Sequence, residues 1–248
     1  MSALARWQSF LEKIEARHEE LLTAARESLP GLVPASDFDV QPFSVAMMAI
    51  RAQCLGLSQK IDRTWSDSAE AAVEAEGADT DQARDLGHAS SWRMELSLRR
   101  TEVEVAAAAA ETLTERARAE LARGFKCTHC GGPLTPKESV FRSHYLPCGF
   151  CKTMNTFEPG MAARMIEHFA AHALGERAAL DTNLRFLDAE RRFREGGSGA
   201  PDKESLIELY TAQVDVYLAE RARHVPDLVK DLDADRRAKI EAFIYSIA

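Results

Sequence analysis

Four cysteines in the middle of the chain form two close pairs, Cys127 with Cys130 and Cys148 with Cys151. Two residues separate the members of each pair, so one tight turn can aim both sulfurs at the same ion. Two C-x-x-C pairs at this separation are typical of a closed, tetrahedral zinc site with four thiolate ligands. The spacing therefore predicts that all four cysteines bind one structural Zn²⁺ ion. The alternatives are four free thiols or, in a secreted protein, two disulfides.

The residues around the pairs suit a small β module. Gly131 and Gly132 follow the first pair and Gly149 lies inside the second, where tight turns need backbone freedom. Residues 140–146 favour a strand, and residues 153–157 offer a partner for it. We therefore expect a small two-stranded structure that carries the metal site.

The segment 124–158, through its sequences CTHCGG and CGFC, resembles the zinc-ribbon superfamily. The resemblance implies a structural zinc module of a kind that contacts proteins or nucleic acid, and it implies no catalytic activity. Lys152 departs from the pattern, because a glycine often follows the second pair in such ribbons. His129 and His144 lie near the predicted site, either as hydrogen-bond donors to it or as plain surface residues.

Composition limits the class of protein. The chain has 248 residues, of which 46% are hydrophobic and 28% charged, with a formal net charge of −8. Such an acidic chain is a poor general binder of nucleic acid, because phosphate contacts need a basic face. The N-terminus has no apolar core of the secretory type, and no run approaches the ~20 apolar residues of a membrane span. Because cysteines in metal spacing fit a reducing compartment, we expect a cytoplasmic protein, in which Cys54 is a small buried hydrophobe.

Helical periodicity dominates the remaining sequence. It predicts helices over residues 2–29, 43–75, 79–123, 159–195 and 202–223, and a last helix that uses Leu228 and continues to Ile247. The expected fold is mainly α: a helical bundle with long antiparallel helices and an inserted small β zinc ribbon. The expected parts are an N-terminal helical region (1–123), the ribbon (124–158), a long helix returning to the bundle (159–195), a linker (196–201) and a C-terminal helical pair (202–248).

Two predicted helices carry distinctive apolar patterns. The first has a heptad seam, which indicates a coiled coil or a long bundle helix and consists of Leu4, Trp7, Leu11, Ile14, His18, Leu21, Ala25 and Ser28. The second has two apolar rows, Val45, Met48, Ala52 and Leu55 on one side and Ile50, Cys54, Leu57, Ile61 and Trp65 on the other. A helix covered on two sides should be central in the bundle. For the helix over 159–195 we expect Pro159 at the first position.

Histidines outside the ribbon raise the question of a second metal. Glu15 and His18 are three residues apart, a ligand pair known from di-metal helical bundles. His168 and His172 are four apart and should lie on one helical face, and His88 is a further donor. The alternative is that these histidines are satisfied core residues or flank the core.

The predicted ribbon has little net charge once a zinc–thiolate centre of about −2 is included. Its charged residues are Lys126, Lys137, Glu138, Arg142, Lys152 and Glu158. Its aromatic residues Phe141, Tyr145, Phe150 and Phe157 are interpreted as its own small core, although aromatics can also stack on bases. Arg142 and Tyr145, between the cysteine pairs, are candidate docking residues if that loop projects from the bundle.

The pattern of motifs favours a non-catalytic function. The sequence contains no G-x-S-x-G, no phosphate-binding G-x-x-x-x-G-K-[ST] and no G-x-G-x-x-G after a strand. We therefore expect a zinc-binding scaffold or adaptor whose partner is another protein, with self-association as a further option. The alternatives are a metalloenzyme with a second metal in the helical bundle, and an accessory factor that binds nucleic acid through the ribbon.

Overall fold

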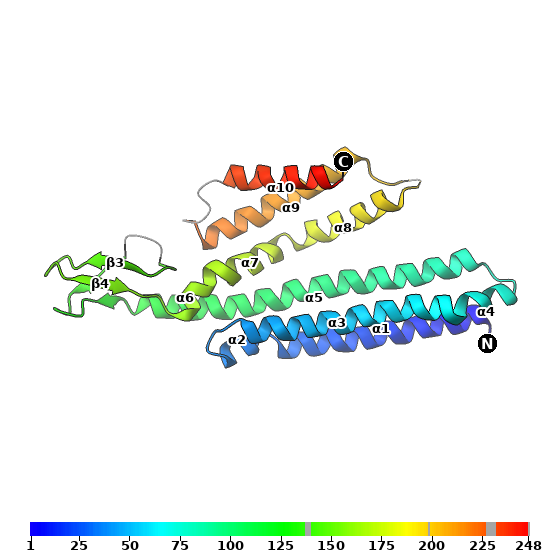
Figure 1. Cartoon of the computed structure of the whole chain (residues 1–248), viewed down its shortest axis with the longest axis horizontal. Helices are drawn as coiled ribbons and strands as arrows, with labels where there is room; N and C mark the ends of the chain where they lie inside the picture. The colour runs from blue at the N-terminus through cyan, green and yellow to red at the C-terminus, as the bar shows by residue number, and fades with distance from the viewer. Residues whose placement is uncertain (137–139, 198, 227–231, 248) are drawn as a thin grey trace. The chain divides into compact units, whose positions relative to one another are not determined.

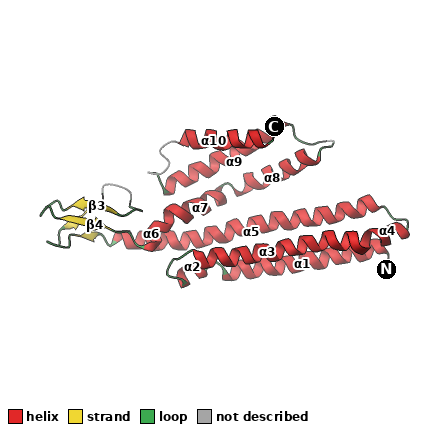
Figure 2. Cartoon of the chain, viewed as in Figure 1, coloured by secondary structure: helices red, strands yellow, loops and turns green. Residues whose placement is uncertain are grey.

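A computed structural model describes residues 1–136, 140–197, 199–226 and 232–247, most of them helical (Figures 1 and 2). The predicted positions Lys137, Glu138 and Leu228, and the last residue, Ala248, lie outside the described residues. The chain divides into two units: Met1–Leu32 with Gln41–Val105, and Val33–Val40 with Ala106–Ala248. The mainly α class with a small β insert is confirmed.

The helices before the ribbon agree closely with the predicted ranges. They are α1 (Ala3–Ser28), α2 (Leu32–Ala35), α3 (Gln41–Thr64), the π-helix η1 (Trp65–Ala69), α4 (Glu70–Ala75) and α5 (Thr80–Ala122). The Ser2 hydroxyl caps α1 by accepting a hydrogen bond from the backbone N–H of Ala5 at 3.2 Å. Asp79 accepts one from the N–H of Gln82 at 3.0 Å, so α5 begins next to the predicted start at residue 79.

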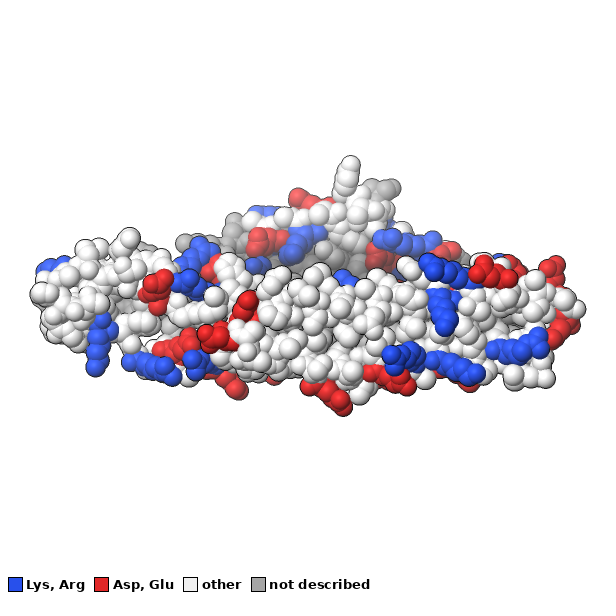
Figure 3. Space-filling view, turned by 60° about the horizontal axis from the view of Figure 1, so that its bottom comes forward, with Lys and Arg blue, Asp and Glu red and all other residues white. Residues whose placement is uncertain are grey.

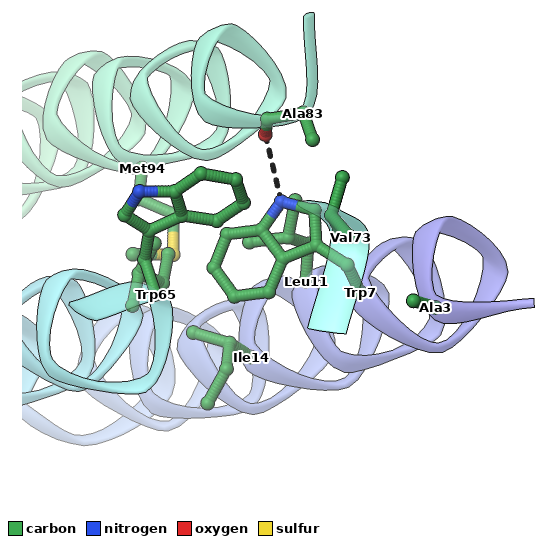
Figure 4. Packing of buried hydrophobic residues seen from close by; sticks show 9 residues of the cluster. Ala3, Trp7, Leu11, Ile14, Trp65, Val73, Ala83 and Met94 are labelled. Carbon is green, nitrogen blue, oxygen red and sulfur yellow. Dashed lines mark hydrogen bonds between the residues drawn. The ribbon is translucent and has the colours of Figure 1, made fainter. Parts of the chain in front are cut away.

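The first unit is organised around Trp7. Its indole packs on Trp65 with ring centroids 5.3 Å apart and donates its N–H to the carbonyl of Ala83 on α5 at 2.8 Å (Figure 4). Gly87 leaves room for this ring, because a Cβ there would lie 3.0 Å from Trp7 Cζ2. The predicted seam of α1 is largely confirmed by the burial of Trp7, Leu11, Ile14, His18 and Ala25. Near its end the buried residues are Leu22 and Leu29 instead of Leu21 and Ser28, because 3.6 residues per turn drift away from a strict heptad.

The central position predicted for the second helix is wrong. Of the two rows on α3, the row with Cys54 and Ile61 is buried, but Val45, Met48 and Leu55 are 52, 61 and 52% exposed. An apolar residue is not necessarily a buried one, because much of a protein's surface is apolar. The helix covered on more than one side is α5, where the successive residues Thr101, Glu102 and Val103 are all buried.

The second unit contains the ribbon and the remaining helices. Its strands are β1 (Phe125–Lys126), β2 (Pro133–Leu134), β3 (His144–Pro147) and β4 (Met154–Phe157). Its helices after the ribbon are α6 (Met161–Met165), the π-helix η2 (Ile166–Ala170), α7 (Ala171–Ala178), α8 (Leu180–Glu195), α9 (Lys203–His224) and α10 (Leu232–Ser246). α9 packs against α7, α8 and α10. Gly175 allows the close approach of α7 and α9, since a Cβ there would lie 3.0 Å from the Tyr217 ring.

The segment 159–195 is mostly helical, but it is not the single continuous helix that was predicted. It begins after Gly160 as its N-cap, so Pro159 is not its first residue. The π-helix η2 and a break at Ala179 divide it into shorter pieces. Met161, in its first turn, is exposed, whereas Phe186 is buried in the cluster around α8, α9 and α10.

Candidate metal centre

The four predicted ligands come together. The sulfurs of Cys127, Cys130, Cys148 and Cys151 all lie within 4.8 Å of one another. Cys127 Sγ is 3.6 Å from Cys151 Sγ, and Cys130 Sγ is 3.7 Å from Cys148 Sγ. A disulfide needs a separation of about 2.05 Å. By contrast, Zn–S bonds of about 2.3 Å in a tetrahedron place the sulfurs roughly 3.8 Å apart, so the donor set fits a zinc ion.

Two short antiparallel hairpins position these thiols. β1 pairs with β2, and β3 pairs with β4 in the register His144 to Phe157 and Pro147 to Met154. The second hairpin is the predicted one, and the first was not predicted because each of its strands has only two residues. The ribbon core consists of Cys127, Leu134, Leu146, Cys148 and Phe157, with Phe125 against Phe157 at 4.4 Å between ring centroids.

The two cysteine turns repeat one backbone pattern. The N–H of Gly131 donates to the carbonyl of Cys127 at 2.9 Å, and the N–H of Lys152 donates to the carbonyl of Cys148 at 3.1 Å. Both donors have left-handed backbones, with φ of 73° at Gly131 and 62° at Lys152. The second turn therefore adopts the glycine conformation without a glycine, and the Lys152 ammonium donates to the carbonyl of Gly149 at 2.9 Å.

Gly132 and Gly149 differ in whether their surroundings leave space for a side chain. A Cβ at Gly132 would lie 2.8 Å from the Phe150 ring, so this position requires the absence of a side chain. Gly149 has no left-handed φ and faces open space, so the freedom predicted for it is not used.

Asn155 is a supporting residue that the sequence prediction missed. It is 4% exposed, and its amide oxygen accepts hydrogen bonds from the backbone N–H of Thr128 at 3.0 Å and from its hydroxyl at 3.2 Å. Its amide nitrogen donates to the Thr153 carbonyl at 2.8 Å and lies 3.6 Å from Cys127 Sγ. Asn155 thereby ties the first cysteine turn to β4. The only signal in the sequence is a polar residue at an inward position of a strand.

The surroundings shift the pKa values of Cys127 and Cys130 in opposite directions. The backbone N–H of Cys130, followed by that of His129, lowers the pKa of Cys127 to about 6. At Cys130 the N–H of Gly132 acts in the same direction, but the neighbouring thiols raise its pKa to about 11. Close thiolates repel one another, so four of them ionise together only beside a cation. The cluster has the chemistry of a divalent-metal site. His129 contributes through its backbone N–H, 3.4 Å from Cys127 Sγ.

Arg142 anchors the loop between the cysteine pairs to η2. Its guanidinium makes two-pronged contact with the Glu167 carboxylate, with Nε 2.9 Å from Oε2. The Glu167 side chain is 7% exposed, and the hydrogen bonds from Arg142 lower its pKa. Arg142 is therefore held by an ion pair within the second unit, while its side chain stays 61% exposed, so its docking role remains a prediction.

Aromatic and apolar side chains remain on the outside of the ribbon. Tyr145 and Met154, on the outward side of the β3–β4 hairpin, are 75 and 58% exposed, and Phe150 in the turn between the strands is 71% exposed. The predicted aromatic core is therefore correct for Phe157 and wrong for Tyr145 and Phe150. We call Tyr145, Phe150 and Met154 the ribbon's apolar residues.

The histidines outside the ribbon do not form a metal cluster within the described part of the chain, where the cysteine site is the one candidate group of three or more ligands. His18 is buried, and Glu15 accepts hydrogen bonds from Ser90 at 2.6 Å and from Arg93. His172 interacts with the Tyr217 hydroxyl at 2.9 Å, and both it and His168 are exposed, as is His88.

Cys54 is buried, as predicted, and desolvation raises its pKa to about 11. A thiol in that state is inert at neutral pH, because the thiolate is the reactive form.

Comparisons with protein-family models, curated proteins and solved structures found no match. No helix in the described residues combines the length and apolar character that crossing a membrane requires. The class of site, a candidate four-cysteine metal site in a mainly helical chain, thus rests on the residues and their geometry.

Proposed function

We propose that this chain is a cytoplasmic zinc-binding adaptor whose ribbon recruits another protein. The observation that carries the proposal is the combination of a closed four-thiol site with large apolar side chains left outside the ribbon's core. Four thiolates leave no open position for a substrate, so the metal's role here is structural. Its effect is to order a module too small to be stable on its own core.

The ribbon's apolar residues supply the contact surface. Tyrosine, phenylalanine and methionine are enriched at the centres of protein interfaces. Burial of one such side chain contributes roughly 1.5–3 kcal/mol to association. The β3–β4 pairing and the ion pair between Arg142 and Glu167 hold this surface in place before a partner arrives, which lowers the entropic cost of binding.

Nucleic acid is the second candidate partner, favoured by one specific observation. Exposed Tyr145 and Phe150 could stack on unpaired bases, and Lys126 and Lys152 are exposed on the same module. The acidic total charge weighs against it.

The test compares variants of the full-length, zinc-loaded protein. Tyr145→Ser and Phe150→Ser should retain zinc and melting temperature but lose a protein that wild type captures from an extract of its source cells, identified by quantitative mass spectrometry. Tyr245→Ser is the matched control, because Tyr245 is also a largely exposed aromatic residue and lies on α10, outside the ribbon. Identical captured proteins for all variants would refute the adaptor role. Salt-dependent binding of a fluorescent single-stranded oligonucleotide, lost in the same two variants, would favour the second candidate instead.

A further inference from the structure

The exposed row of α3 has the spacing of a coiled-coil seam. Its members are Val45, Met48, Ala52 and Leu55, separated by three, four and three residues, which are the a and d positions of two heptads. All four are exposed, although the opposite side of the helix is buried through Phe43, Cys54 and Ile61. We call these four residues the α3 row. Such spacing suits a helix as the covering element.

The α3 row is also unusually poor in charge. Between Asp39 and Lys60 the sequence contains one charged residue, Arg51. The Glu102 carboxylate binds the Arg51 guanidinium with two hydrogen bonds of 2.6 Å each, so its charge is neutralised within the unit. A water-facing helix surface normally carries charges, whereas interface centres are depleted in them. The space-filling view in Figure 3 shows broad areas without acidic or basic side chains.

Gly56 gives an independent indication of close approach at this surface. A glycine inside a helix is less favourable than alanine, so it normally has a packing reason. Two other helical glycines have one: Gly87 meets Trp7, and Gly175 meets Tyr217. At Gly56, next to Leu55, a Cβ would have no described atom within 4 Å. The position is suited to a second backbone or a large side chain from outside the chain.

We propose that the α3 row pairs antiparallel with the α3 row of a second copy of this chain. A two-fold axis near Ile50 would set Val45 opposite Leu55 of the second copy and Met48 opposite its Ala52. The long side chain of Met48 would thus meet the small side chain of Ala52. Gly56 would lie opposite Ser44, where two small residues allow the helices to approach. The same surface serves both copies, as an isologous interface requires.

The neutrality of the α3 row argues against charged occupants, and its symmetric spacing about Ile50 suits a second copy of itself. A strongly acidic or basic protein would find no opposite charge on it, and nucleic acid needs a basic face. The α3 row has four residues, far fewer than the roughly 20–30 residues that each partner contributes to a standard interface. The dimer should therefore be weak and concentration-dependent. The α3 row shares no residue with the ribbon, so this proposal does not depend on the adaptor role proposed above.

The first experiment measures mass against concentration for the full-length, zinc-loaded chain by analytical ultracentrifugation. Wild type should shift reversibly from monomer to dimer. Met48→Glu should weaken the dimer by ~10-fold or more, because a carboxylate would be buried without a partner. Its fold should persist, since Met48 is already exposed in the monomer. Val216→Glu, at an exposed apolar position of α9, is the matched control and should dimerise like wild type.

The variant Gly56→Leu tests whether Gly56 serves the dimer interface or only the stability of the monomer. In the monomer the added side chain meets open space and improves helix propensity, so the thermal midpoint at low concentration should rise. In the dimer it blocks the approach of the second helix, so association should weaken by ~10-fold or more. A Gly56→Leu protein that dimerises as well as wild type would contradict the proposal.

Cysteine cross-linking tests the orientation. Oxidation of a mixture of Met48→Cys and Ala52→Cys proteins should yield the disulfide-linked heterodimer, and neither protein alone should cross-link efficiently. Efficient cross-linking of each variant with itself would indicate parallel helices and refute the pairing. A chain that stays monomeric at every concentration overturns the proposal; resistance of the Met48→Cys thiol to alkylation in that monomer would identify a segment of the same chain as the occupant.

Discussion

Arg142 and Glu167, 25 residues apart in sequence, form an ion pair in which the arginine's Nε lies 2.9 Å from one carboxylate oxygen. It joins the ribbon's connecting loop to a π-helical turn, and a π-turn displaces its side chains from the positions of a regular helix. The carboxylate is nearly inaccessible, whereas the guanidinium is partly in water. Substitution of Arg142 and substitution of Glu167 should therefore affect the stability of the unit differently.

Removing Arg142 should be more harmful than removing both partners. Arg142→Ala leaves a buried carboxylate without its counter-charge, while the double variant with Glu167→Ala leaves no charge behind. A double-mutant cycle of thermal unfolding checks this order. Arg164→Ala is the control, because its partner Glu158 is largely exposed and such pairs contribute little. Equal destabilisation by Arg142→Ala and Arg164→Ala would show that the pair does not hold the loop.

Removing the metal should unfold the ribbon and spare the first unit. Cys127→Ser should lose most of its zinc, measured by inductively coupled plasma mass spectrometry against one equivalent in wild type, because thiolate coordination and ribbon folding are one event. All three tryptophans, Trp7, Trp65 and Trp92, lie in the first unit. Chelation should therefore broaden the amide signals of β3 and β4 while tryptophan fluorescence stays unchanged. Full zinc retention by Cys127→Ser would refute the ligand assignment.

Asn155→Ala should weaken zinc binding by ~10-fold or more, because groups that orient metal ligands matter nearly as much as the ligands. The substitution frees the first cysteine turn from β4 and removes a donor near Cys127 Sγ. Competition with a chromogenic chelator measures the affinity. Thr156→Ala, at the exposed neighbouring position of the same strand, should leave it unchanged.

The cysteine turns predict opposite outcomes for two glycines. Gly131→Ala should destabilise the ribbon by about 1–2 kcal/mol, because its left-handed φ is strained for any side chain. Gly149→Ala should be nearly neutral, since that position has open space and no left-handed φ. Lys152→Gly should be tolerated without loss, because glycine is at ease in the conformation that Lys152 adopts. Hydrogen exchange of the β3–β4 amides distinguishes the three variants.

The first unit should lose stability as the pH falls below about 6.5, the ordinary pKa of histidine. Burial, the largest cause, lowers the pKa of His18 in the folded state. The unfolded chain therefore binds a proton at a pH where the folded chain does not, and protonation favours unfolding. Urea unfolding followed by tryptophan fluorescence at neutral and mildly acidic pH should show this loss. His18→Leu should reduce the loss, and His88→Gln, at an exposed position, should not.

The sequence by itself determined most of the helices and the four candidate metal ligands of this protein. Local signals suffice for these: the spacing of Cys127, Cys130, Cys148 and Cys151 places four donors in two turns, and Ser2 and Asp79 begin helices through their own side chains. The α1 seam was predictable for the same reason, because periodicity is a local property of the chain.

Only the tertiary structure decided which apolar residues are covered and which polar residues meet. Val45 and Cys54 are equally convincing as core residues in sequence, but one is exposed and the other buried, since burial depends on the neighbouring elements. Tyr145 and Phe157 differ in the same way. The contacts of Asn155 with Thr128 and of Arg142 with Glu167 join residues more than 20 positions apart. No local pattern encodes such partners, because their proximity results from the packing of the whole unit.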